Sequence, residues 1–213
     1  MIALQLFLAR GQKMNIRDEY VIAMGEDMGH FCYELQADFD WLRHKWSEFR
    51  HLFANERIDL LNVVASNFFL FLHTVLFEDA MLHLCRLTDP PESRNRAGVQ
   101  KNLTVITLTD MLSDPVLKAS VENKIAEVRG NCEFARKWRN KHLAHTDLET
   151  ALKGRSLTLP SADITNIDTA VISIKNLLGT IDAHYRLPVS AFADDPWGAK
   201  SLVHHLEQVA PPR

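Results

Sequence analysis

The sequence predicts an all-α protein, built as an up-and-down four-helix bundle with short additional helices. Apolar residues recur at steps of three and four along four long segments, which is the spacing of one helix face. Eight glycines and eight prolines in 213 residues are few for a protein rich in tight turns, so long helices are favoured over short strands. A hydrophobic content of 46% suffices for one substantial core. We expect a lead at residues 1–19, the bundle at 20–186 and a tail at 187–213.

The first long helix is expected from about Tyr20 to Phe53. Its apolar stripe consists of Met24, Met28, Phe31, Leu35, Phe39, Leu42, Trp46 and Phe49. Gly25 and Gly29 weaken its beginning, because glycine disfavours the interior of a helix. Regular helix is therefore expected from about His30.

The second long helix is expected from about Asn55 to Leu87, and it is apolar on nearly every side. Residues 63–77 are apolar enough to suggest a membrane span, but the polar Ser66, Asn67 and His73 interrupt them. A buried central helix is the better interpretation, without a membrane partner. The helix should end at Asp89-Pro90-Pro91, since the residue before a proline avoids helical dihedral angles. A polar loop is expected at 92–102.

The remaining helices follow from caps and periodicity. A short helix is expected at 103–112, after which Asp114-Pro115 supplies an N-cap and a first-turn proline. The apolar register of that next helix is Val121, Ile125, Val128, Cys132 and Ala135, and Gly130-Asn131 is expected to kink or split it. Ser161 is expected to cap the last long helix, which carries its stripe from Ile164 to Tyr185. The tail looks peripheral, with one short helix around 200–208.

Composition limits the possible partners and the compartment. A net charge of −3 gives no global attraction to nucleic acid, so an RNA site needs a local basic patch. The cysteines Cys32, Cys85 and Cys132 have no disulfide spacing, which favours a reducing cytoplasm. The apolar N-terminus lacks the basic residues of a signal peptide, and either Met1 or Met14 is the start.

One segment concentrates the residues that carry chemistry. Between Phe134 and His145 lie four cations, two histidines and no acid: Arg136, Lys137, Arg139, Lys141, His142 and His145. Arginine contacts phosphate oxygens through two parallel donors, and histidine moves protons near neutral pH. Arg139 falls on the buried stripe of its helix, so it needs an anionic partner. Asp79, on the stripe of the central helix, is a candidate supporting acid; alternatively it forms a structural ion pair with Arg86 or His83.

The arginine, the polar Asn140 and the histidine five residues further on resemble the signature of the HEPN superfamily. Over about 55–186 the sequence resembles the abortive-infection AbiU-like branch of this superfamily. Its further motifs are Leu84-Cys85-Arg86-Leu87-Thr88-Asp89-Pro90, Lys101-Asn102-Leu103-Thr104 and the run from Arg139 to Asp147. The resemblance implies a helical bundle that forms a homodimer in which two copies of the motif meet.

The resemblance also implies a reaction. His145 would act as general acid or base while the RNA 2'-hydroxyl attacks phosphorus, Arg139 would stabilise the phosphorane, and Asn140 would orient the phosphate or the histidine. The flanking Arg136, Lys141 and His142 would bind the substrate. The scheme needs no metal and no cofactor. It implies a toxin or phage-defence endoribonuclease, with RNA as substrate and an antitoxin protein as a possible partner.

Two alternatives stay open at this point. Arg136 and His142 are also separated by five residues, so the arginine and the histidine of the motif can be paired differently. A nonenzymatic HEPN module that binds RNA, a nucleotide or a partner protein would carry the same motif. Residues six apart lie about 120° apart on a regular helix, so the helix should end or distort near 141–144 if Arg139 and His145 act together.

Overall fold

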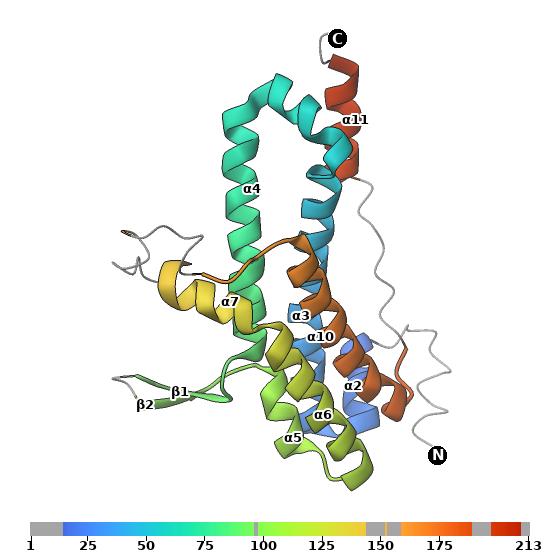
Figure 1. Cartoon of the computed structure of the whole chain (residues 1–213). Helices are drawn as coiled ribbons and strands as arrows, with labels where there is room; N and C mark the ends of the chain where they lie inside the picture. Colours follow the sequence, from blue (N-terminus) through green and yellow to red (C-terminus); the bar gives the residue numbers. More distant parts are fainter. Residues whose placement is uncertain (1–14, 96–97, 144–151, 153–158, 189–196, 210–213) are drawn as a thin grey trace, which may run out of the picture.

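The computed structural model describes residues 15–95, 98–143, 152, 159–188 and 197–209. The described chain is predominantly helical, and its sheet is a single pair of short strands, so the all-α prediction is confirmed. Figure 1 shows the long helices α3, α4, α6 and α10 gathered around a common core, with α7 lying across α4. The core is one contiguous cluster that runs from Tyr20 to Val203.

The N-terminal part folds back on itself. Helix α2 (Ile16–Met24) and helix α3 (Glu26–Leu52) meet at Gly25, whose φ of 83° suits glycine. A Cβ on Gly29 would lie 2.5 Å from the Cα of Val21, so the missing side chain lets the two helices touch. The expectation of regular helix only from His30 is wrong, because these glycines form a corner and a close contact.

Helix α4 (Ile58–Thr88) follows the short η1 (Asn55–Arg57) and is interrupted at Ala65, where φ is −163°. Its C-terminal half is buried, through Ala80, Met81, Leu84, Cys85 and Leu87. Between residues 63 and 75 it exposes Val63, Phe68, Leu70, Phe71 and Val75, so the prediction of a buried central helix is wrong there. By length and composition alone the span 55–88 also fits a membrane helix, a test that core helices of soluble proteins pass as well.

The segment after α4 is a β-hairpin where a polar loop was expected. Strands β1 (Glu92–Asn95) and β2 (Gly98–Lys101) pair antiparallel, with Glu92 opposite Lys101. Apart from Val99 and Gly98 their residues are polar, so the usual alternation of apolar and polar side chains is missing. Below the hairpin, the buried Thr104 hydroxyl donates to the carbonyls of Leu87 and Asp89. The expected short helix follows as η2 (Val105–Thr107) and α5 (Leu108–Met111).

The second half of the core confirms the predicted helices and changes one cap. Helix α6 (Pro115–Asn131) begins at the Asp114 cap and ends at Cys132, where α7 (Glu133–Trp138) starts, so the predicted split is confirmed. Helix α10 (Ile164–Tyr185) packs along α6. Its N-cap is Asp163 and not Ser161, because Asp163 and Asn166 exchange two hydrogen bonds as a capping box.

The C-terminal helix α11 (Ala199–Val209) matches the predicted short helix but is not peripheral. It packs against α3 through the buried Ala199 and Val203. The Glu48 carboxylate on α3 accepts a hydrogen bond from the backbone N–H of Ala199. This contact joins the tail to the bundle because a carboxylate stabilises a helix N-terminus.

Candidate active site

The candidate motif begins where α7 changes its winding. The α-helix ends at Trp138, and η3 (Arg139–Leu143) continues as a π-helix. A π turn is rare and occurs often at functional sites. The expected distortion is confirmed, and it begins at Arg139, two residues earlier than predicted. His145 lies outside the described residues.

Arg139 is held by a carboxylate at the end of α4. Its Nη1 donates to both Asp89 oxygens, at 2.6 and 2.8 Å, and its Nε donates to Asn140 Oδ1 at 3.2 Å. Burial lowers the pKa of Arg139, but the hydrogen bond and the charge of Asp89 outweigh that effect and raise it above its ordinary value. Among the described residues, Nη2 of Arg139 has no hydrogen-bond partner. The guanidinium is therefore charged and held in one orientation, and among the described contacts its Nη2 group is left for a ligand.

Asp79 is not the partner of Arg139, and the alternative of a structural ion pair is confirmed, with a different cation from those expected. Asp79 forms an ion pair with Lys45 on α3, and neither Arg86 nor His83 is its partner. His83 lies four positions after Asp79 on one helix, but His83 and Arg86 both face Asp38 instead. Asp79 therefore ties α4 to α3.

A sequence signal for Asp89 exists. An acid at the C-terminal end of a helix meets the negative end of the helix dipole, so it needs a nearby cation. Asp89 is the C-cap of α4, directly before Pro90. The supporting acid was thus detectable from its unfavourable place on its own helix, although the sequence could not identify which cation it meets.

Arg136 supports the site from behind. Its guanidinium donates to the carbonyl of Thr88 at 3.1 Å and to that of Arg129 at 3.4 Å, and it lies 3.6 Å from the Glu133 carboxylate. An arginine at the C-terminal carbonyls of α4 stabilises that helix end. Of the two arginines, Arg139 is the one with an amino group still available to a ligand among the described contacts.

His142 turns toward α4. Its Nε2 lies 3.7 Å from the Glu78 carboxylate, and its ring meets the edge of Trp138 at a centroid distance of 5.9 Å. Trp138 in turn donates its indole N–H to the carbonyl of Pro160 at 2.9 Å. Glu78 is therefore a second acid that the sequence interpretation missed. Asn140 and Lys141 remain exposed at the surface beside it.

No metal site stands out in the described part of the chain, where no three His, Cys, Asp or Glu side chains come together. The three cysteines are buried and unpaired. Burial raises the pKa of Cys85 to about 11 and that of Cys32 and Cys132 to about 12, so the thiols stay protonated near neutral pH. They serve as core residues and not as nucleophiles.

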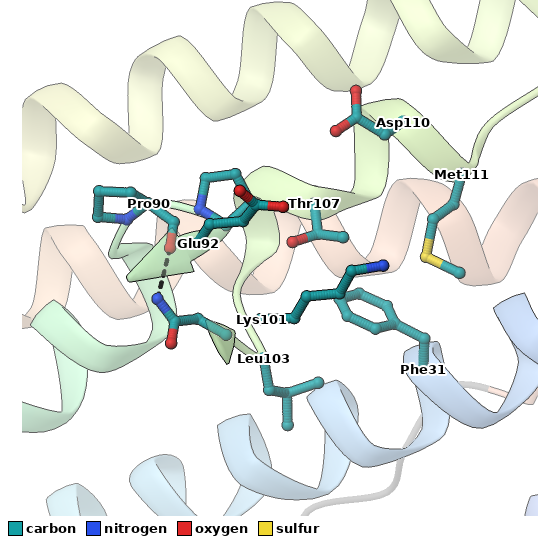
Figure 2. Close-up of a pocket in the computed structure, with 10 residues that line it drawn as sticks. Phe31, Pro90, Glu92, Lys101, Leu103, Thr107, Asp110 and Met111 are labelled. Atoms are coloured by element: carbon teal, nitrogen blue, oxygen red, sulfur yellow. Dashed lines mark hydrogen bonds between the residues drawn. The ribbon is translucent and has the colours of Figure 1, made fainter. Parts of the chain in front are cut away.

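Two pockets flank the end of α4 beneath the hairpin. One, of about 730 Å³, lies between Phe31, Pro90, Thr107 and Met111 (Figure 2). The other, of about 540 Å³, includes Asp89 itself together with Trp41 and Arg86. Lys101, Asn102 and Leu103 line both, so the two pockets adjoin.

Comparison with known proteins gives one match. The HEPN family model described as AbiU2 matches residues 26–195, which include the whole of the candidate site. Neither a curated protein nor a solved structure matches the chain.

Proposed function

The chain belongs to the AbiU2 family of HEPN proteins, and on that basis we propose that it is a metal-independent endoribonuclease, acting as a toxin or phage-defence effector in the cytoplasm. The observation that carries the proposal is the Arg139 guanidinium at the α7–η3 junction. It is kept charged by Asp89, which leaves Nη2 available to a phosphate oxygen among the described contacts.

In the proposed reaction the RNA 2'-oxygen attacks the neighbouring phosphorus. A bond forms from the 2'-oxygen to phosphorus as the bond from phosphorus to the 5'-oxygen breaks, leaving a 2',3'-cyclic phosphate and a 5'-hydroxyl. His145 takes the proton from the 2'-hydroxyl or gives one to the 5'-oxygen. Arg139 stabilises the charge that grows on the phosphorane oxygens, and Asn140, which accepts from Arg139 Nε, orients the guanidinium or the phosphate.

A second copy of the chain is part of the proposal. Phe68, Phe71, Val75 and Leu82 on α4 are 41–66% exposed, and at 100° per residue they lie within about 60° of one another. A contiguous apolar stripe of this kind marks an interface. Glu78, the partner of His142, borders the stripe on the same helix. A two-fold contact through the stripe would therefore bring two η3 segments close together and add the positive charge that one chain lacks.

The alternative is a nonenzymatic module that binds RNA, a nucleotide or an antitoxin protein. The specific observation in its favour is the Asp89 carboxylate, which already balances the charge of Arg139 in one chain. Such a site still binds an anion but offers less stabilisation to a transition state. Assays of RNA cleavage and of RNA binding distinguish the endoribonuclease from the binding module.

The test is incubation of labelled RNA with the purified protein in EDTA, followed by analysis of the product ends. Cleavage that survives chelation, leaves 2',3'-cyclic phosphate and disappears in Arg139→Ala and His145→Ala supports the enzyme. Lys175→Ala is the matched control, because Lys175 is an exposed cation on α10, outside the basic segment 134–145, and this variant should cleave RNA as the wild type does.

Arg139→Lys checks that loss of activity is not loss of folding. It keeps one charge for Asp89 but removes the second amino group that would reach the phosphate. We expect its melting temperature to stay near that of the wild type while cleavage falls at least a hundredfold. No cleavage by the wild type, with RNA still bound, would favour the binding module.

A further inference from the structure

Trp41 is a large aromatic side chain left open beside the candidate active site. It is 55% exposed on α3 and lines the pocket of about 540 Å³ that also contains Asp89, the partner of Arg139. His44 stacks on its ring at 15° and a centroid distance of 5.7 Å, and the Lys45 ammonium lies 5.9 Å from its centroid. Neither of these two lines the pocket, while Ala37 and Asp38, one turn earlier, do. One side of the indole is thus supported and the other faces the pocket.

The polar groups around this indole suit the edge of a nucleobase. Glu34 and Asp38 present carboxylates on the same face of α3, at positions seven and three residues before Trp41. Each carboxylate has lone pairs beyond those used by its present partners, which are Arg17 for Glu34 and both Arg86 and His83 for Asp38. Such acceptors match the amino groups of adenine, cytosine or guanine.

Two cations, Arg86 and Lys101, line the pocket of Trp41 and are available to the phosphates of a bound strand. The Arg86 side chain is 59% exposed and donates to Asp38 at 2.8 Å, and Lys101 lies at the boundary of the two adjoining pockets. Aromatic stacking combined with backbone-tracking cations is the general mode of single-strand recognition.

The adjoining pocket contains a polar atom without a partner. The Thr107 hydroxyl oxygen is buried and unbonded within the described chain, although buried hydroxyls are nearly always satisfied. Figure 2 shows Phe31 on α3 and Met111 on α5 directed into the same space that Lys101 enters from β2. The lining of this pocket is mixed, with Phe31 and Met111 beside the charged Glu92, Lys101 and Asp110, and it suits a planar ligand with polar edges.

We propose that the groove beneath the hairpin binds two consecutive nucleotides of the RNA substrate, one base stacked on Trp41 and the next in the pocket of Phe31, Thr107 and Met111. The inference rests on the proposed function for the identity of the ligand, and it adds the residues that set base preference. Because Asp89 lines the Trp41 pocket and holds Arg139, the bound bases lie next to the phosphate that is cut.

The experiment measures fluorescence anisotropy of labelled ten-nucleotide 2'-O-methyl RNAs of each base, which cannot be cleaved by 2'-oxygen attack. We expect Trp41→Ala to weaken binding about tenfold and Trp41→Phe to weaken it less, as expected for loss of one stacked base. The uridine oligomer should bind weakest, since uracil lacks an amino group. Trp197→Ala, at another exposed tryptophan, is the matched control and should bind as the wild type does.

Thr107→Val separates binding from folding. Removing an unsatisfied hydroxyl without changing the shape of the side chain should leave the melting temperature unchanged or raise it, while RNA binding becomes severalfold weaker. If Trp41→Ala and Thr107→Val both bind RNA as tightly as the wild type while RNA is still cleaved, the groove is wrong and the proposed function stands. If the wild type neither binds nor cleaves RNA, both fail.

Discussion

Arg139 and Asp89 lie fifty residues apart in the chain, and a single guanidinium nitrogen of Arg139 reaches both carboxylate oxygens of Asp89. The pair joins the π-helix η3 to the C-terminus of α4. It places a charged arginine beside a helix end that Arg136 already stabilises through the Thr88 carbonyl. The candidate site is therefore held by two arginines, one structural and one facing outward.

Asp89→Asn should separate binding from turnover. Removing the carboxylate charge takes away a competitor of the phosphate, so RNA should bind severalfold tighter. Arg139 loses its fixed orientation, so cleavage at saturating RNA should fall at least tenfold. Single-turnover kinetics and RNA titration measure the two effects.

Asp168→Asn is the matched control for this charge removal. The Asp168 carboxylate on α10 pairs with Arg50 on α3 and lines neither pocket, so both RNA constants should match the wild type. Weaker RNA binding in Asp89→Asn would mean that Asp89 does not compete with the phosphate.

Phe71→Asp should dissociate the proposed dimer. The side chain is 66% exposed within one chain, so a charge there costs little in the monomer but is expensive in an apolar interface. Sedimentation velocity should show the shift to monomer. Leu70→Asp is the control, because Leu70 is 67% exposed but lies on the other side of α4 from Phe68. Dissociation by both variants would place the interface elsewhere.

Gly29→Ala should destabilise the protein by about 1–3 kcal/mol, the usual cost of overpacking. The added Cβ would lie 2.5 Å from the backbone of Val21, and neither helix can yield without opening the α2–α3 corner. Gly179→Ala, inside α10 with nothing within 4 Å of the added atom, should instead stabilise by about 1 kcal/mol. Urea unfolding of the two variants tests the contrast. Equal destabilisation would rule out the close contact as the cause.

Two buried groups should give opposite pH dependences of stability. Burial raises the pKa of Asp182, which accepts from the Tyr20 hydroxyl at 3.1 Å, to about 6. The folded state then holds this proton more tightly than the unfolded state does. The stabilisation from protonated Asp182 is therefore present below about pH 4 and is lost as pH rises through 6. Burial lowers the pKa of His83 to about 4. Its contribution is present above about pH 6.5 and is lost as pH falls through 4.

Between pH 4 and 6 the contributions of the two groups to the free energy of unfolding change in opposite directions, each by on the order of 2 kcal/mol. In Asp182→Asn only the histidine slope remains, so stability should rise with pH more steeply than in the wild type. In His83→Gln it should fall with rising pH. Urea unfolding at pH 4, 5 and 6 measures both slopes. Unchanged slopes in both variants would contradict the assignment.

Hydrophobic periodicity, together with the positions of glycines, prolines and capping residues, was enough to predict the helices. The split after Gly130-Asn131, the Asp114 cap and the helix at 200–208 could be predicted because each depends on residues adjacent in sequence. The hairpin at 92–101 could not, since Val99 is its one large apolar side chain and its strands pair through backbone groups that leave no hydrophobic pattern. The Gly25 corner was misread because a weak helix position and a required turn look alike in sequence.

The sequence by itself determined the all-helical class, the location of the basic motif and the need of Arg139 for an anionic partner. Only the tertiary structure decided that this partner is Asp89, that Asp79 faces Lys45, and that half of α4 stays exposed. Helix periodicity states which residues share a face, and it carries no information about which neighbouring helix covers that face. Charge pairing and burial depend on the arrangement of helices in space, which is fixed by contacts between residues far apart in the chain.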